Sequence, residues 1–287
     1  MLKQSYVNKN SNDKIEDFLD ENSIHVIDCS SPYAFKKLFD DLAYKMPYSN
    51  IYNIKSFIKE VSYLRLPEII NMLNDSDSKY ILSEYVKNRE LGATCFDNTY
   101  NPDVRQYFPE KYFTYSIDEI FVDVGVYDAF TSYDFFQQVN GEFKAIYAYE
   151  PNPICYRISK KHYVMMKMPK EKVYLQQKGL SNINATVKLV NVSMGGSYID
   201  ELAGEYEVDV CRLDDEIKEV SFIKMDIEGS ELKALMGAED IIKKCKPKIA
   251  VCIYHQPEDI WTIPYYLKKI VPQSQLPPPE GGGFNID

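Results

Sequence analysis

The sequence predicts an α/β protein with a doubly wound, mostly parallel sheet. From residue 119 onward, short apolar runs rich in β-branched and aromatic residues alternate with helix-like segments. Strands are expected near Phe121, Ile146, Val173, Val187, Phe222 and Ile249, and helices near Ser132, Ile154, Ser230 and Pro257. This alternation is typical of a parallel sheet with helices on both faces.

Residues 1–118 have a different hydrophobic pattern and are predicted to form a mainly helical N-terminal or cap region. Amphipathic, helix-like pieces cover residues 14–20, 33–44, 54–64 and 69–73, and residues 24–28 have the character of a short strand. We expect the sheet domain over residues 119–271. A disordered tail rich in proline and glycine is expected over residues 272–287.

Composition and charge disfavour several classes of protein. The 287 residues are 45% hydrophobic, which is enough for a sizeable core. Apolar runs stay well below the roughly 18 residues of a membrane span, and the N-terminus lacks the apolar region of a signal peptide, so we expect a cytoplasmic protein without membrane insertion. The net charge of −10 disfavours nucleic acid as a partner. Six cysteines without C-x-x-C spacing are expected to be reduced thiols. The oligomeric state stays open.

The first two strands of the sheet domain are predicted to hold one nucleoside. After the first strand, Asp123 and Gly125 turn the chain where we expect a backbone to approach a ligand closely. Glu150 ends the next strand at the spacing of a βαβ unit, where its carboxylate can accept hydrogen bonds from both ribose hydroxyls. Thr131 and Asn152, from the same two segments, complete the predicted cofactor-binding residues.

The predicted ligand is S-adenosyl-L-methionine rather than a dinucleotide. The turn after Gly125 lacks the G-x-G-x-x-G run that seats a pyrophosphate on a helix N-terminus. A G-x-x-x-x-G-K-[ST] loop is also absent from the sequence. An oxidoreductase with a nicotinamide cofactor is therefore disfavoured.

Further acids and a histidine follow two later strands. Asp226 and Glu228 end the strand near Phe222, and because strand residues two apart point to one side, they are predicted to pair on a metal ion or a substrate hydroxyl. Alternatively, Glu228 caps the following helix and Asp226 orders the turn. His255 ends the next strand, where an imidazole can deprotonate an alcohol. His255 and Asp226 are the catalytic candidates, and a divalent metal on Asp226 and Glu228 stays open.

Six stretches together resemble the FkbM family of S-adenosylmethionine-dependent methyltransferases. They are Glu119–Gly125, Tyr149–Asn152, Lys178–Leu180, Phe222–Leu235, Lys246–Val251 and Tyr254–His255. The similarity covers residues 107–271. It implies a Rossmann-like class I methyltransferase fold, S-adenosylmethionine as the methyl donor, and O-methylation of a small-molecule or glycan acceptor, often a sugar in a bacterial polysaccharide, glycolipid or natural product.

The resemblance also implies roles for individual positions. Asp123 and Gly125 would line the methionine end of the cofactor, and Glu150 would bind the ribose. Asp226 and His255 would lie near the acceptor.

Two departures from the family pattern affect the prediction. Family members usually carry G-A-x-x-G, whereas here Ala129 replaces the second glycine, a change that fits if φ is negative there. Family members also continue into a strand pair bearing an R-H-Y-like segment, whereas here residues 271–273 run into the tail, so the sheet is expected to lack its final strands. The alternative prediction is a degenerate, non-catalytic S-adenosylmethionine-binding relative.

Overall fold

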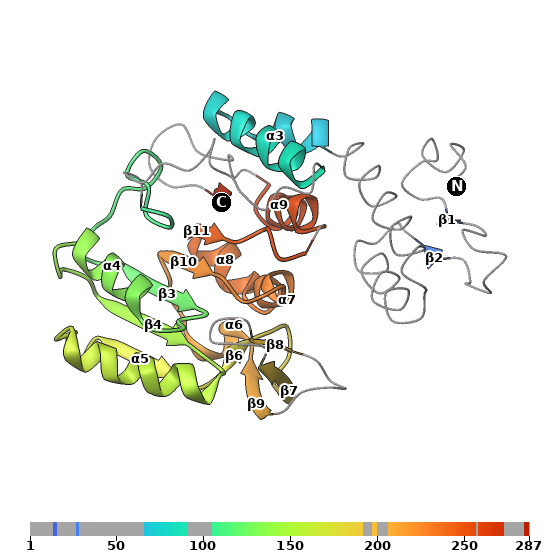
Figure 1. Cartoon of the computed structure of the whole chain (residues 1–287). Coiled ribbons are helices and arrows are strands. Elements are labelled where there is room, and N and C mark those ends of the chain that lie inside the picture. Colours follow the sequence, from blue (N-terminus) through green and yellow to red (C-terminus); the bar gives the residue numbers. More distant parts are fainter. Residues whose placement is uncertain are drawn as a thin grey trace.

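A parallel sheet with the strand order β12-β11-β10-β3-β4-β5 forms the centre of the structure, which is a computed structural model (Figure 1). Its strands are β3 (Ile120–Val124), β4 (Ala145–Tyr149), β5 (Val173–Gln176), β10 (Phe222–Met225), β11 (Lys248–Val251) and β12 (Phe284–Ile286). The helices are α3 (Ser76–Glu90), α4 (Phe130–Gln138), α5 (Pro153–Met165), α6 (Leu213–Glu216), α7 (Glu231–Met236), α8 (Glu239–Cys245) and α9 (Asp259–Ile270). The doubly wound fold predicted from the sequence is confirmed.

The structure describes part of the chain. Backbone is described for residues 14–15, 27–28, 66–90, 105–191, 197–199, 206–256, 258–272 and 284–286, and side chains for residues 66–85, 105–190, 206–256 and 258–272. The helical pieces predicted over residues 33–44 and 54–64 lie outside this part. The domain boundaries therefore stay predictions.

The strand order reverses beside β3. The chain runs from β3 outward to β4 and β5, and then returns to place β10 against the opposite side of β3. In open parallel sheets, ligands bind outside the carboxyl ends of the strands at such a switch point. The topology therefore places the candidate site where β3, β4 and β10 end.

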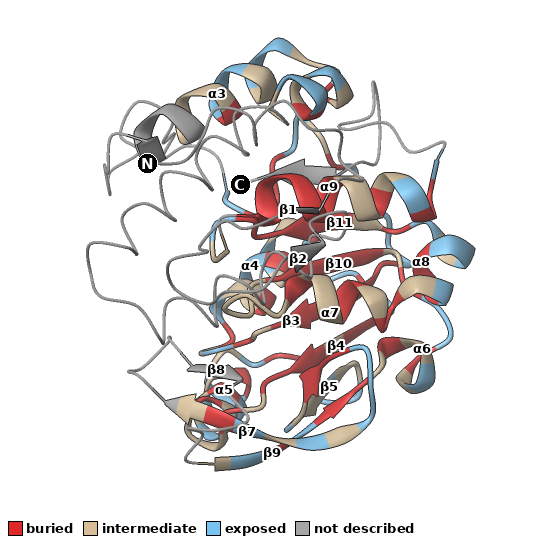
Figure 2. Cartoon of the chain, turned by 90° about the vertical axis from the view of Figure 1, so that its right-hand side faces the viewer, coloured by how far each residue is buried: buried red, intermediate tan, exposed pale blue. Residues whose placement is uncertain are grey.

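Two hydrophobic clusters pack on opposite faces of the sheet, because successive strand residues point to opposite sides. Val122 and Ile223 belong to the cluster that includes residues of α7, α8 and α9, whereas Phe121 and Phe222 belong to the cluster that includes residues of α4 and α5. Figure 2 shows the central strands buried between these layers. Ile69 also joins the first cluster, so the described part of the N-terminal region shares the core of the sheet domain.

A second, mixed sheet corrects one prediction. Its strands are β6 (Gly179–Leu180), β7 (Ala185–Asn191), β8 (Ser197–Ile199) and β9 (Tyr206–Cys211), in the order β6-β9-β7-β8. Val187 was expected in the main sheet but lies in β7, antiparallel to β9. The reason is visible in the pattern, since Thr186 and Lys188 are exposed on alternate positions, as in an antiparallel strand with one solvated face.

The ends of the chain bring further corrections. Lys14–Ile15 form β1, antiparallel to β2 (Ile27–Asp28), so the helical prediction for residues 14–20 is wrong at its first two residues. At the other end, Phe284–Ile286 pair in parallel with β11, so these three residues extend the sheet where a disordered tail was predicted. Residues 273–283 lie outside the described part. Residues 69–72 are helical, as predicted.

A buried ion pair joins β3 to β10 at the switch point. Asp123 lies directly opposite Lys224 in the parallel register, with Lys224 Nζ 3.2 Å from Asp123 Oδ1. Lys224 Nζ also donates to the carbonyl of Gly125 at 2.8 Å, and Ser132 Oγ donates to Asp123 Oδ2 at 2.7 Å. Burial alone would lower the pKa of Lys224, but the charges of Asp123 and Asp226 outweigh it and raise that pKa. Lys224 is therefore a buried, charged residue.

This pair predicts a coupled effect on stability. Lys224→Met should lower the free energy of unfolding by about 3–5 kcal/mol, because it leaves the Asp123 carboxylate buried without its counter-charge. Adding Asp123→Asn should recover most of that loss, since the amide can keep the bond to Ser132. Urea unfolding followed by circular dichroism measures both variants. Equal stability of the single and double variants would contradict a coupled pair.

Candidate functional site

A cleft of about 630 Å³, partly open to solvent, lies at the carboxyl ends of β3, β4 and β10. Its lining residues are Val124, Gly125, Tyr127, Tyr149, Glu150, Pro151, Cys155, Gly179, Leu180, Leu189, Asp226, Ile227, Glu228 and Ser230. Three of these described lining residues are acidic and none is basic. The cleft therefore favours a ligand with positive charge.

The chain after β3 passes so close to the chain after β10 that only glycine fits at residue 125. The φ of Gly125 is +78°, and a Cβ atom there would lie 2.0 Å from the carbonyl oxygen of Asp226. From the sequence, close approach of a ligand was the expected reason for this glycine. In the structure the Asp226 backbone already leaves no room for a side chain at residue 125, and Gly125 also lines the cleft.

Ala129 lies in a left-handed conformation that alanine adopts at a cost. Its φ is +71° and ψ is 5°, and the residue is fully buried at the N-cap of α4. The condition under which alanine would fit here, a negative φ, is therefore not met. For a residue with a Cβ atom this conformation costs roughly 1–2 kcal/mol. The loop that borders the cleft is therefore strained at the position where the family pattern has glycine.

Glu150 links the loop after β3 to the loop after β4. Its Oε2 accepts from the Tyr127 backbone N–H and its Oε1 from the Asn152 backbone N–H, both at 2.9 Å. Burial raises the pKa of Glu150, and these two hydrogen bonds oppose the rise. Because each carboxylate oxygen has two acceptor sites, one on each oxygen remains for a ligand in the cleft.

Three predicted cofactor-binding residues do not line the cleft. Asp123 is fully buried between Ser132 and Lys224. Asn152 is the N-cap of α5, where its Oδ1 accepts from two backbone N–H groups, and Thr131 is half-buried in the first turn of α4. Contact of these side chains with a cofactor stays a prediction. The contacts in the structure position the two loops.

Asp226 forms the opposite wall of the cleft. The Tyr107 hydroxyl donates to Asp226 Oδ2 at 2.7 Å, and the Tyr254 hydroxyl donates to Oδ1 at 3.1 Å. Burial would raise the pKa of Asp226, but Lys224, the two tyrosines and His255 lower it overall. Sequence reasoning missed Tyr107, which carries no motif, and Tyr254, although the latter adjoins His255.

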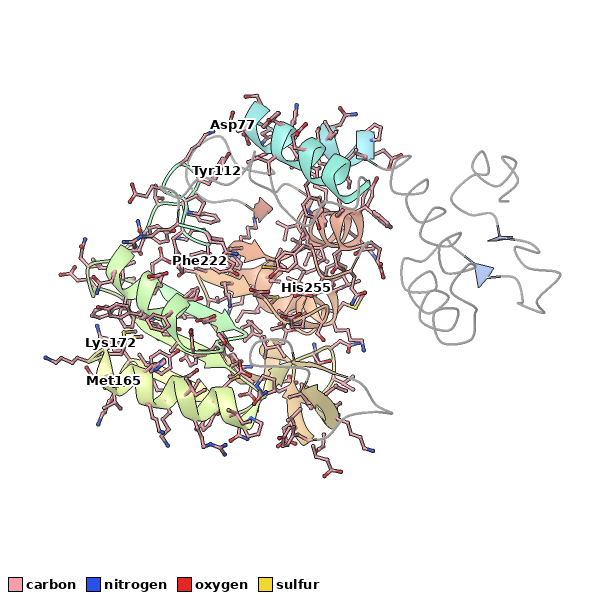
Figure 3. All side chains as sticks on the ribbon, in the orientation of Figure 1. Asp77, Tyr112, Met165, Lys172, Phe222 and His255 are labelled. Atoms are coloured by element: carbon pink, nitrogen blue, oxygen red, sulfur yellow. The ribbon has the colours of Figure 1, made fainter. Side chains whose placement is uncertain are left out.

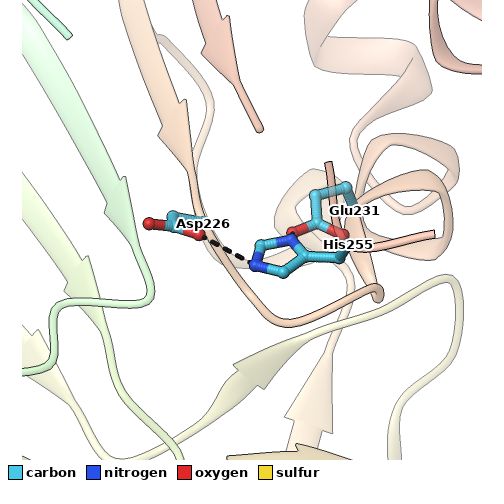
Figure 4. Close-up of side chains that lie close together, drawn as sticks. All are labelled: Asp226, Glu231 and His255. Atoms are coloured by element: carbon cyan, nitrogen blue, oxygen red, sulfur yellow. Dashed lines mark ion pairs between the residues drawn. The ribbon is translucent and has the colours of Figure 1, made fainter. Parts of the chain in front are cut away.

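His255 contacts three carboxylates. Its Nδ1 lies 2.8 Å from Glu231 Oε1 and its Nε2 lies 3.4 Å from Asp226 Oδ1 (Figure 4). Nε2 also lies 3.5 Å from Glu228 Oε2. Figure 3 shows His255 at the carboxyl edge of the sheet. Burial would lower the pKa of His255, but the contact with Glu231 and the charges of Asp226 and Glu228 raise it overall. Asp226, Glu228 and His255 therefore meet at one point, as the sequence suggested.

Glu231 is the residue that sequence reasoning overlooked in this group. It is fully buried, and its Oε1 accepts from the Ile227 backbone N–H at 2.9 Å. The N-cap of α7 is Ser230, not Glu228, and the Ser230 side chain makes no capping hydrogen bond. Glu228 instead has φ +55°, a strained value that is frequent at functional sites. The signal for Glu231 was present in the I-E-G-S-E stretch.

The fold and the site define a class I methyltransferase-like protein of the Rossmann type. Residues 123–274, more than half of the chain, match the family model described as the Methyltransferase FkbM domain. The chain therefore belongs to this family. Membership supports methyltransferase activity in general.

A solved structure supports the fold. The crystal structure of methyltransferase FkbM from Methylobacillus flagellatus KT matches with a TM-score of 0.61 and 24% identity, over 75% of this chain and 54% of that chain. The chain thus spans about half the length of that protein. An rRNA methylase from Streptococcus thermophilus matches with a TM-score of 0.35 and 14% identity, over 53% of this chain and 70% of that chain, which is too weak to support an argument.

No curated protein matches the sequence. Among the described residues, no helix has the length and apolar character to span a membrane.

The strain at Ala129 predicts a stabilising substitution. Ala129→Gly should raise the free energy of unfolding by about 1 kcal/mol, because glycine adopts a positive φ without steric cost. The matched control is Ala234→Gly inside α7, which should lower it by about 1 kcal/mol. Chemical denaturation measures both. An Ala129→Gly variant no more stable than the wild type would show that this strain is absent in solution.

Proposed function

We propose that the protein is an S-adenosyl-L-methionine-dependent O-methyltransferase that acts on a hydroxyl of a sugar in a bacterial polysaccharide, glycolipid or natural product. The observation that carries the proposal is the acidic cleft at the switch point, with Glu150 at the tip of β4 and no basic residue among its described lining residues. S-adenosylmethionine carries a sulfonium and an ammonium group, whereas a dinucleotide carries phosphates that this cleft would repel.

The residues that line the cleft fit the parts of that cofactor. Glu150 keeps one acceptor site free on each oxygen, which suits the two ribose hydroxyls. Apolar side chains on the same side of the cleft, among them Pro151, Leu180 and Leu189, suit a purine ring. The net negative charge of the cleft lining suits the positively charged end of that cofactor.

The acceptor hydroxyl is proposed to lie against Asp226 and His255. When bound, the cofactor supplies an electrophilic methyl group. The protein holds the hydroxyl oxygen in line with that group, and the hydroxyl proton passes to the imidazole or carboxylate beside it. Tyr254 is partly exposed and donates to Asp226, so it both fixes this carboxylate and offers a ring face to a sugar.

A second candidate function is cofactor binding without methyl transfer. The strained Ala129 in the cleft loop favours it, because a loop that has lost its usual glycine is expected in a degenerate relative. The two candidates agree on the ligand and differ on turnover.

Cofactor binding tests the shared part of both candidates. S-adenosylhomocysteine should bind the wild type in calorimetric titration, and Glu150→Ala should weaken binding at least about tenfold, the equivalent of 1.4 kcal/mol, because the ribose contacts are lost. Glu142→Ala, at an exposed glutamate, is the matched control. Glu150→Gln keeps one carbonyl acceptor and should show an intermediate loss. Binding of NAD instead of S-adenosylhomocysteine would overturn the proposal and revive the oxidoreductase.

Turnover separates the two candidates. Methyl transfer from labelled S-adenosylmethionine to a panel of hexoses and deoxyhexoses should be measurable for the wild type. His255→Ala should reduce it by about a hundredfold or more while S-adenosylhomocysteine still binds, since acid–base groups contribute on that order. Full turnover in this variant would remove His255 from the reaction. Cofactor binding with no transfer to any acceptor would support the non-catalytic relative.

A further inference from the structure

Asp226, Glu228, Glu231 and His255 form a group, here called the His255 cluster, in which three carboxylates face one imidazole. One ligand atom from each of Asp226, Glu231 and His255 lies within 4.8 Å of the others. The Lys224 ammonium group contacts Asp123 and the carbonyls at the end of β3. The cluster therefore holds more negative than positive charge, a balance that an additional cation would restore.

Two buried side chains in the cluster carry polar atoms without hydrogen-bond partners among the described residues. Glu231 is fully buried, and its Oε2 has none. The His255 side chain is 8% exposed, and neither of its ring nitrogens has one, although Nε2 points at Asp226 (Figure 4). Buried polar atoms of this kind call for an explanation such as an ion that binds there.

The distances around Nε2 fit two ligands of one metal ion better than hydrogen bonds. Nε2 lies 3.4 Å from Asp226 Oδ1 and 3.5 Å from Glu228 Oε2, which exceeds the usual N–H···O separation of about 2.7–3.2 Å. Ligands at about 2.0–2.2 Å from a tetrahedral ion are roughly 3.4 Å apart. Nε2 thus stands at the spacing of two ligands of one ion from each of these carboxylate oxygens.

The residues around these three ligands resemble the outer shell of protein metal sites. Glu231 Oε1 lies 2.8 Å from His255 Nδ1 without hydrogen-bond geometry, and a carboxylate at that distance favours a proton on Nδ1, which leaves the lone pair of Nε2 for a metal. Tyr107 and Tyr254 donate to the two oxygens of Asp226 and fix its orientation. Each of these contacts is one that would orient a ligand.

We propose that His255 Nε2, Asp226 and Glu228 bind one divalent transition-metal ion, with Glu231 as the positioning residue behind the histidine. Imidazole with carboxylates suits Mn²⁺ or Zn²⁺, whereas Mg²⁺ and Ca²⁺ prefer oxygen ligands alone. Asp226 and Glu228 line the cleft, so the ion has an open side toward it. If the proposed function holds, that open side is where the acceptor hydroxyl binds. Its proton then passes to a carboxylate beside it, because both ring nitrogens of His255 are occupied.

Mn²⁺ binding to the full chain, freed of metal by chelation and desalting, tests the site without any acceptor. Electron paramagnetic resonance should show one bound Mn²⁺ per chain, and electron spin-echo modulation should show coupling to one imidazole nitrogen. His255→Ala should abolish that coupling, and Glu228→Gln should weaken binding at least tenfold. Glu231→Gln should weaken it by about 10–100-fold, as is usual for residues that orient a metal ligand. Glu142→Gln is the control for an exposed acidic residue and should change nothing.

The outcomes separate this proposal from the proposed function. Glu150→Ala should bind Mn²⁺ as the wild type does, and the metal-free wild type should still bind S-adenosylhomocysteine. Folding of each variant is checked by circular dichroism, and the partly exposed Glu228 gives a variant that spares the core. The proposal is overturned by a folded wild type without saturable Mn²⁺ binding. It is equally overturned by binding that lacks nitrogen coupling and persists in every variant, which would mark a diffuse acidic surface and leave His255 as a free base.

Discussion

The buried pair of Asp123 and Lys224 is the interaction on which the arrangement of the site depends. It joins β3 to β10 where the strand order reverses, and Lys224 also holds the carbonyl of Gly125. A buried charge is tolerated only when it is paired, so neither side chain can move without the other. The direction in which the chain leaves β3 and the position of Asp226 on β10 are therefore fixed together. Both walls of the cleft follow from this one constraint.

The loop between β3 and α4 shows how tightly the walls approach each other. Gly125 passes so close to the Asp226 carbonyl that a side chain has no room, and Glu150 holds the loop from the other side through the Tyr127 N–H. Ala129 then closes the loop in a left-handed conformation. Strain of this kind persists only where surrounding contacts outweigh it, and it is frequent at ligand sites. The loop is thus held in one shape before any ligand binds.

The charge distribution links the cofactor proposal to the metal proposal. Glu150, Asp226 and Glu228 line the cleft, and Glu231 lies directly behind. Their negative charge exceeds what Lys224 and His255 supply, so the site favours cations at both of its ends. A sulfonium compound at one end and a divalent ion at the other would satisfy the same electrostatic requirement.

The sequence by itself determined the fold class and several residues at the ligand edge of the sheet. Gly125, Glu150, Asp226 and His255 each come after an apolar strand, and parallel strands end at one edge, so a local pattern sufficed to bring them together. Which of them contact one another was decided by tertiary structure alone. Asp123 forms an ion pair with Lys224, and Glu231 lies against His255. Tyr107 donates a hydrogen bond to Asp226, which is 119 positions away in the sequence. The positive φ of Ala129 likewise depends on the tertiary contacts of its loop, which no local pattern in the sequence encodes.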